Sequence, residues 1–278
     1  LSIRCSYHSH KLYIMDKIIF PDKEIKRIQV INRIQQHFKL YNKYNILLSD
    51  LVLNETNKKN IPILSEITEN TKIPPDILIE INKLINRAIK LLSTVKQSNN
   101  KVIKKQHKSK DNYILLIYRD IHIEVNKKAY NRIKSQIIND SFKKYMTFDT
   151  LLWILYYRYI NLQLYNNSQG AVHPSHYHNL HKKHNLQVEG FGSFFNHTLK
   201  YYYGLFPDIE KYFGCLGNFF LSKLTESFYV INPPFTVYHI NRTIKHIIKQ
   251  LNIHKSLTIL LVIPSWINKD RQELNKEY

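Results

Sequence analysis

Cysteine, glycine and proline are scarce in this sequence, and long apolar runs are absent. Only two of the 278 residues are cysteines, Cys5 and Cys215, and they lie far apart. This excludes a disulfide framework and a cysteine-based zinc pattern. The longest apolar stretches, such as 257–264, are far shorter than the roughly 20 residues that cross a bilayer, and no signal-peptide pattern opens the chain. We therefore expect a soluble intracellular protein that does not enter a membrane.

Acidic side chains are also scarce. The sequence has 41 Lys and Arg residues against 21 Asp and Glu residues, which gives a formal charge of +20 and a pI near 9.7. Such a charge attracts polyanions and raises the rate of encounter with them, so nucleic acid is the expected partner. An AT-rich coding sequence would also enrich Lys, Asn, Ile and Tyr. The charge therefore supports this interpretation without deciding it.

The chain is long enough for one large domain or two small ones, and we favour two lobes. Residues 1–167 are expected to form a mainly helical lobe with a short hairpin, which binds the RNA substrate. Sequence periodicity and turn signals predict helices over 21–44, 74–95, 127–144 and 150–164, and a hairpin over 113–118 and 121–125. The polar, lysine-rich segment 96–110 is expected to be a loop.

Residues 168–278 are expected to form an α/β fold, a reduced Rossmann-type (class I) core. The expected strands are 186–188, 228–231 and 257–264, and the expected helices are 193–203 and 237–251. Glu189-Gly190-Phe191-Gly192-Ser193 follows the first strand, and its glycines would let the backbone approach a ligand. Gly-Phe-Gly is a weak motif, and a plain tight turn is the alternative explanation.

The tetrapeptide Asn232-Pro233-Pro234-Phe235 follows the apolar run 227–231 and fits the methylation of an aromatic amine. The lone pair of such an amine is delocalised into its ring until acceptors hold the two hydrogens. The Asn232 side-chain oxygen and the Pro233 carbonyl could be these acceptors, and the two prolines would hold them rigidly. Phe235 offers a ring for base stacking, worth about 1–3 kcal/mol. These residues indicate an adenine-N6 methyltransferase site.

The alternative is a strand that simply ends in a Pro-Pro turn. The chain contains such a case at Ile73-Pro74-Pro75-Asp76, where the prolines open a helix. That segment lacks both the Asn and the aromatic residue. In an open α/β sheet, the loops after 186–188 and 228–231 would lie at the same carboxyl edge, where ligands bind. This convergence favours the catalytic interpretation.

From about Leu151 to Trp266 the chain resembles the cap-specific mRNA adenosine-N6 methyltransferases, the phosphorylated-CTD-interacting-factor family. Several blocks carry the resemblance in the family's order: Leu151–Gln163, Gln169-Gly170-Ala171 with Pro174, Val188–Asn196, Phe206–Gly217, Ser227–Phe235 and Ile263–Trp266. Their common order makes coincidence a poor explanation.

The resemblance implies transfer of a methyl group from S-adenosylmethionine to N6 of the first transcribed nucleotide, a 2′-O-methyladenosine next to the 7-methylguanosine cap of mRNA. Asn232 and Pro233 would hold N6, and Phe235 would stack on the adenine. The residues implied to line the cofactor are Gln169, Glu189, Gly190, Phe191, Gly192 and Asn196. Trp266 and Arg158 are implied in contact with the cap or a phosphate, with a buried Trp and a surface Arg as the alternative.

The chain departs from the family pattern at several points. Phe194 stands where the family loop has proline, and Ser265 replaces an acidic residue before the tryptophan. We find no tryptophan-rich WW module before the helical lobe, so we expect that binding of the polymerase tail is not inherited. The chain stops at Tyr278 whereas the family continues with further sheet, so three explanations stay open: the core is truncated, a protein partner completes it, or this member of the family is minimal.

Five histidines have a spacing that could present a metal face on a helix: His173, His176, His178, His181 and His184. Few acidic residues lie near them to support metal ligands, and the resembled family needs no metal. We therefore expect no metal, and interpret the segment as a partly exposed helix near the path of the RNA.

Two other functions remain open. A catalytically weak cap-binding or regulatory subunit would bind the cofactor without turnover and work through a partner. An amino-methyltransferase with another target is the second, since Asn-Pro-Pro-aromatic motifs also serve methylation of DNA adenine, cytosine N4 and glutamine amides. Competition between capped RNA and duplex DNA would separate these.

Overall fold

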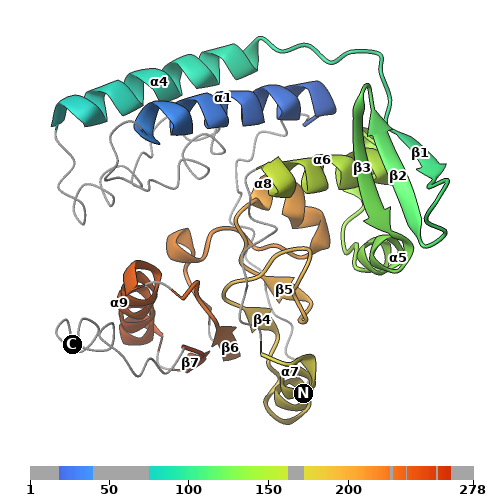
Figure 1. The fold of residues 1–278 in the computed structure, drawn as a ribbon. Helices are drawn as coiled ribbons and strands as arrows, with labels where there is room; N and C mark the ends of the chain where they lie inside the picture. The colour runs from blue at the N-terminus through green and yellow to red at the C-terminus, as the bar shows by residue number, and fades with distance from the viewer. Residues whose placement is uncertain are drawn as a thin grey trace. The chain divides into compact units, whose positions relative to one another are not determined.

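The computed structural model describes residues 19–39, 75–161, 172–225, 228–235, 237–254 and 256–263. The chain divides into two compact units (Figure 1). The first comprises residues 1–107, 115–124 and 145–165, and the second comprises 108–114, 125–144 and 166–278. The last division falls close to the boundary expected at 167/168, but two segments of the amino-terminal half belong with the second unit. Gln169 and Trp266 lie outside the described residues.

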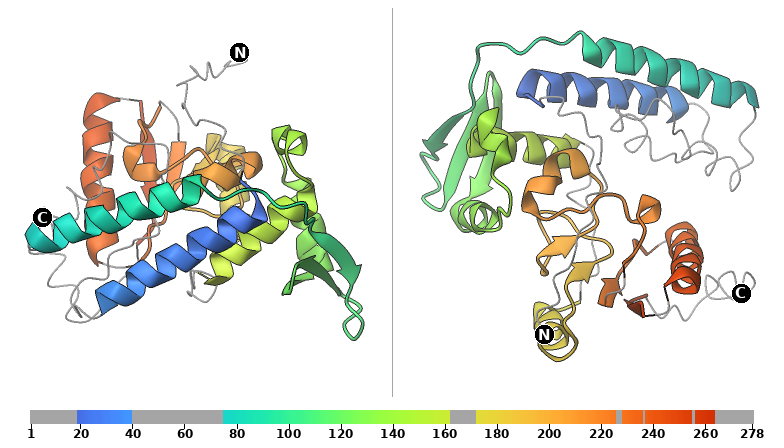
Figure 2. Two further views of the ribbon diagram at one scale, coloured as in Figure 1. Left: turned by 90° about the horizontal axis from the view of Figure 1, so that it is seen from above. Right: turned by 180° about the vertical axis from the view of Figure 1, so that it is seen from behind.

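The first unit is built mainly from helices. α1 (Pro21–Lys39), α4 (Pro75–Ser93) and α6 (Phe148–Asn161) confirm three predicted helices, and α1 packs against both of the others. α1 and α4 run side by side in every view (Figures 1 and 2). α6 is buried through most of its length because its sequence is apolar on all sides. None of the helices in the described ranges is long and apolar enough to cross a bilayer.

A three-stranded sheet has the order β1-β2-β3. β2 (Tyr113–Tyr118) and β3 (Ile121–Asn126) confirm the predicted hairpin, whose turn holds Arg119 at φ 54°. β1 (Ile103–Gln106) lies within the segment expected to be a loop, so that expectation is wrong for these residues. All residues of β1 are exposed. An exposed edge strand lacks the alternation of apolar and polar residues by which a strand is recognised.

The helix predicted over 127–144 forms only in part. α5 (Lys127–Ser135) begins after Asn126, whose side chain accepts the N–H of Lys128, and η1 (Ser141–Lys144) is a separate short helix. Between them, the N–H groups of Ile138 and Asn139 both donate to the carbonyl of Tyr212. These bonds draw the backbone out of the helical pattern, which explains the interruption.

The second unit contains a parallel sheet in the order β5-β4-β6-β7. Its strands are β4 (Val188–Glu189), β5 (Tyr201–Tyr202), β6 (Phe228–Ile231) and β7 (Thr258–Leu261). α9 (Val237–Ile253) connects β6 to β7. The strand expected over 228–231 and the helix expected over 237–251 are thereby confirmed. The strand expected over 257–264 forms at 258–261, and the strand expected over 186–188 is shifted, because it shares only Val188 with β4. The protein is of mixed α/β class.

Helices cover both faces of this sheet. Along β6, Tyr229 and Ile231 join a core with Ile247 of α9, whereas Val230 packs with Tyr177 of α7 (Pro174–His184). Successive residues of a strand point to opposite faces, so α9 and α7 cover opposite faces. This explains why β6 is apolar throughout, as is usual for a parallel strand buried on both sides.

The helix predicted over 193–203 does not form. A turn at 194–196 leads instead into β5, which pairs with β4. The N–H of Tyr203 donates to the carbonyl of Glu189 at 2.9 Å. Aromatic residues have modest helix propensity and favour strands, so pairing with β4 prevails over a local helix. The connection to β6 runs through α8 (Pro207–Glu210), η2 (Lys211–Phe213) and η3 (Phe219–Leu221).

Candidate functional site

The two predicted motifs meet in the middle of the parallel sheet. From β4 the sheet grows to one side through β5 and to the other through β6 and β7. The strand order therefore reverses between β4 and β6, and open α/β sheets bind ligands at the carboxyl ends of the strands at such a point. Glu189 is in register with Val230, and the N–H of Gly190 donates to the Val230 carbonyl at 2.7 Å. The loops that begin at Gly190 and Asn232 therefore start side by side, as expected.

The loop after β6 begins from a fixed strand end. The N–H of Val262, just after β7, donates to the carbonyl of Ile231 at 2.8 Å. Asn232 is half-buried and its Oδ1 atom is buried. Pro233 is buried, whereas the side chain of Phe235 is 39% exposed. The loop thus combines a shielded amide oxygen at Asn232 with a partly accessible ring at Phe235.

The glycines of the loop after β4 allow neighbouring strands to approach closely. A Cβ atom on Gly190 would lie 2.8 Å from Cγ1 of Ile231, and one on Gly192 would lie 3.0 Å from Cβ of Tyr202. The N–H of Gly192 donates to the carbonyl of Tyr203 at 2.8 Å. The N–H groups of both glycines thus bond to neighbouring strands. Their lack of a side chain serves the packing of β4 between β5 and β6.

Glu189 ends β4 and is buried. Its Oε1 accepts the N–H groups of Thr198 and Leu199 at 2.5 and 2.6 Å. Burial raises the pKa of Glu189 to about 7, although these two N–H groups act in the opposite direction. The carboxyl therefore fixes the approach to β5, and it titrates close to neutral pH.

Sequence analysis missed Glu210, a fully buried residue at the end of α8. Its Oε2 accepts the N–H of Phe194 at 3.2 Å and the hydroxyl of Tyr202 at 2.9 Å. Glu210 therefore ties the loop after β4 to β5. Phe194 stands where the resembled family has proline, which has no N–H to donate. The sequence signal that could have identified Glu210 is an acidic residue within an otherwise largely aromatic and apolar stretch.

The loop after β4 presents side chains next to an aromatic cluster. The half-buried ring of Phe191 lies 5.0 Å from Phe219 and 5.6 Å from Phe220 between centroids. Asn196 is exposed, and its Oδ1 accepts both the N–H and the hydroxyl of Ser193, at 2.9 and 2.8 Å. Of the predicted cofactor residues that the structure describes, Phe191, Gly192 and Asn196 reach the surface, whereas Glu189 and Gly190 are buried.

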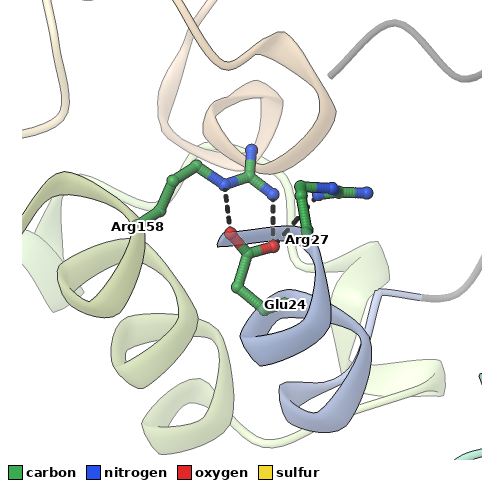
Figure 3. A network of polar contacts seen from close by, with 3 residues as sticks. All are labelled: Glu24, Arg27 and Arg158. Carbon is green, nitrogen blue, oxygen red and sulfur yellow. Dashed lines mark hydrogen bonds and ion pairs between the residues drawn. The ribbon is translucent and has the colours of Figure 1, made fainter. Parts of the chain in front are cut away.

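Arg158 belongs to the first unit and is fully buried. Its Nε and Nη2 atoms each donate to one carboxylate oxygen of Glu24 at 2.7 Å, and Nη1 of Arg27 donates to the same carboxylate at 3.0 Å (Figure 3). Two parallel hydrogen bonds between α6 and α1 give this pair a structural role. The structure thus differs from both sequence-based interpretations, a phosphate contact and a surface arginine, and we leave Arg158 out of the proposed site.

The histidines around α7 make separate contacts. The ring of His173 caps the helix by accepting the N–H of Ser175, and Nδ1 of His181 lies 2.7 Å from the carbonyl of Leu186. The ring of His184 lies against Phe228. In the part of the chain that the structure describes, no group of three or more His, Cys, Asp or Glu side chains could hold a metal ion.

The structure is that of a mixed α/β protein in which the loops after β4 and β6 start side by side where the strand order reverses. The family described as "Phosphorylated CTD interacting factor 1 WW domain" matches residues 127–277, more than half of the chain. The chain belongs to this family, which confirms the family expected from the sequence blocks. Membership supports a cap-associated methyltransferase-type role. No curated protein matches the chain.

The family match corrects one expectation. We expected no WW module and concluded that binding of the polymerase tail is not inherited. The matching family is described as a WW domain, and its match covers 127–277. The expectation that the chain has no WW module is therefore wrong, and the conclusion about binding of the polymerase tail is withdrawn with it. We looked for a tryptophan-rich segment upstream of the helical lobe, whereas the match begins at Lys127, inside the expected lobe, and includes Trp153 and Trp266.

Proposed function

We propose that this protein transfers a methyl group from S-adenosylmethionine to N6 of the first transcribed adenosine, a 2′-O-methyladenosine, next to the 7-methylguanosine cap of mRNA. The observation that carries the proposal is the start of the Asn232–Phe235 loop beside the Gly190 loop, where the strand order reverses. In this proposal the second unit is a reduced Rossmann-type methyltransferase core. S-adenosylmethionine, when bound, supplies an electrophilic methyl group and leaves as S-adenosylhomocysteine.

The residues after β6 hold the amine. Oδ1 of Asn232 and the carbonyl of Pro233 accept the two N6 hydrogens, which turns the nitrogen lone pair out of conjugation with the ring. Acceptors on a rigid Pro-Pro segment select an amine over a carbonyl, which has no hydrogen to donate. The accessible ring of Phe235 stacks on the adenine. Pro234 holds the backbone between them. After methyl transfer the positively charged N6 loses one proton to water, so no general base is required of the chain.

The residues after β4 bind the cofactor. The surface side chains Phe191 and Asn196, with Gly192 between them, line it, and the aromatic ring supports stacking. Glu189 and Gly190 set the shape of the loop, because their polar groups bond to Thr198, Leu199 and Val230. From the family resemblance, Gln169 completes the cofactor site and Trp266 contacts the cap.

Substitution of Asn232 tests the proposal directly. Asn232→Ala should lower methyl transfer to capped RNA that begins with adenosine by about 100-fold or more, the usual cost of losing a pre-positioned polar group at a reacting atom. Its affinity for S-adenosylmethionine, measured by calorimetry, should stay within about two-fold of the parent, since the cofactor is assigned to the loop after β4. Asn252→Ala, at an exposed position on α9, is the matched control and should keep full activity.

Phe235→Ala provides an independent test. It should cost about 1–3 kcal/mol of base stacking, seen as a lower kcat/KM for RNA. Ile248→Ala, which removes an exposed apolar side chain from α9, is its control. Full transfer activity in both Asn232→Ala and Phe235→Ala would refute the assignment of this loop.

A further inference from the structure

One edge of α9 carries basic side chains, and the helix has no acidic residue. His239, Arg242, His246 and Lys249 follow one another at spacings of three and four, which places them along one side of the helix. Ile240, Thr243 and Ile247 are buried on a different side. We call the four residues from His239 to Lys249 the basic edge of α9.

The members of the basic edge lie close enough to affect one another. Burial lowers the pKa of His246, and the charges of Lys249 and Arg242 lower it further. Burial likewise lowers the pKa of His239, with a further contribution from Arg242. Both histidines therefore favour the neutral form at pH 7, and the permanent charges of the edge are those of Arg242 and Lys249.

Aromatic rings and a further lysine adjoin the basic edge. The guanidinium of Arg242 lies 3.9 Å from the centroid of the Phe220 ring, and the ring of His246 lies 4.9 Å from that of Phe219. The N–H of Leu224 donates to Oε1 of Gln250 on α9 at 3.0 Å. The segment 219–224 is therefore held beside α9, and exposed Lys223 lies in it between Ser222, which contacts His246, and Leu224, which contacts Gln250.

Cations interleaved with aromatic rings are what proteins use to follow a single nucleic-acid strand. Lysine and arginine neutralise phosphates, while aromatic faces and Arg contribute stacking and cation–π contacts without reading sequence. An acidic peptide could also pair with the positive charges, but it has no base to stack on the Phe220 ring, which is half-buried. The combination favours RNA over an acidic peptide.

We propose that the basic edge of α9, with Lys223 and Phe220 beside it, binds the phosphate backbone of single-stranded RNA. α9 begins at Val237, two residues after Phe235. An RNA whose first base occupies the Asn232–Phe235 loop would therefore continue along this 17-residue helix, which is about 25 Å long. The direction of the RNA rests on the proposed function, whereas the binding surface itself rests on the charges and rings of α9 and η3.

Salt dependence of RNA binding tests the proposal. The double variant Lys223→Gln/Lys249→Gln removes two exposed charges. Its affinity for a fluorescent capped RNA of about ten nucleotides should fall by about ten-fold at physiological salt. The slope of log affinity against log salt should become shallower by about 0.7 for each phosphate that the protein no longer neutralises, about 1.4 in all. Lys223→Arg/Lys249→Arg keeps the charges and should keep the slope.

The matched control removes the same charge from another surface. Lys200→Gln/Lys211→Gln changes an exposed lysine just before β5 and a half-buried lysine of η2 and should leave the slope unchanged. An equal loss of affinity in both glutamine variants would overturn the proposal, because net charge alone would then explain binding. An unchanged slope in the α9 variant would overturn it as well. Binding is measured without S-adenosylmethionine, so either result is obtained whether or not the protein transfers a methyl group.

Discussion

Replacing Gly190 with alanine should force the two central strands of the parallel sheet apart. The added Cβ would lie 2.8 Å from Cγ1, 3.1 Å from Cγ2 and 3.2 Å from Cα of Ile231. Carbon atoms pack best at about 3.5–4.0 Å, so the closest contact must open by about 0.7 Å. Ile231 is fully buried and cannot swing into solvent. Gly190 does not have a positive φ, so the cost is steric overpacking of about 1–3 kcal/mol.

A double-mutant cycle isolates this contact. Ile231→Ala removes both side-chain atoms that would clash, and alone it should cost about 2–5 kcal/mol because a buried side chain is truncated. The double variant Gly190→Ala/Ile231→Ala should be more stable than the sum of the two single effects predicts, by about 0.5–3 kcal/mol. Urea unfolding followed by circular dichroism measures all four proteins.

Gly217→Ala is the control for this cycle. A Cβ at Gly217 would meet nothing within 4 Å, but the residue has φ +124°, so alanine there would strain the backbone without a steric clash. Its effect should add to that of Ile231→Ala without coupling. If the effects of Gly190→Ala and Ile231→Ala were also simply additive, the close approach of Gly190 to Ile231 of β6 would be refuted.

Three further changes test the surroundings of the site. The folded-state pKa of Glu189 is raised from 4.5 to about 7, so the native state binds more protons than the unfolded state between these pH values. The contribution of Glu189 to the free energy of unfolding therefore falls by about 3 kcal/mol as pH rises through this window. Glu189→Gln should remove this dependence of stability on pH. Urea unfolding of both proteins at about pH 5 and about pH 8 measures it. Tyr202→Phe removes the hydroxyl that donates to Glu210 and should cost about 1–3 kcal/mol, because a buried acceptor loses this donor. Calorimetric unfolding measures the cost, and an unchanged stability would disprove the anchoring role. Arg158→Met removes a buried partner of Glu24 and should cost about 3–5 kcal/mol without changing cofactor affinity; weaker RNA binding at unchanged stability would restore the ligand role.

The sequence was informative where one local pattern decided the structure. β6 is a short apolar run followed by Asn232 and two prolines, and α9 repeats apolar residues at helical spacing, so both were predicted close to their observed bounds. The segment 193–203 was misjudged because its structure depends on distant partners. Glu210 and the carbonyl of Glu189 bond to its backbone, and no local pattern in the segment reveals those contacts. β1 escaped prediction for a related reason, since pairing with β2 stabilises a strand whose residues are all exposed.

In the candidate site too, some features could be predicted from the sequence and others depend on contacts between distant residues. The general rule for open α/β sheets predicted that the Gly190 and Asn232 loops would converge, because the rule needs only the order of elements. Sequence could not show that the glycines serve packing between strands, or that Glu210 anchors the loop, since both depend on atoms far away in the chain. Arg158 was assigned to a ligand because sequence alone does not reveal its partner Glu24, which lies on α1.

The identity of the methylated nucleoside decides whether this protein methylates the first adenosine beside the cap. The purified protein is incubated with labelled S-adenosylmethionine and short RNAs that begin with A or G, capped or uncapped, beside Asn232→Ala. Nuclease digestion then locates the label. The account predicts label on N6 of the first adenosine alone, dependent on the cap and lost in Asn232→Ala. Label on internal adenosines, on RNA that begins with G, or retained in Asn232→Ala would contradict it.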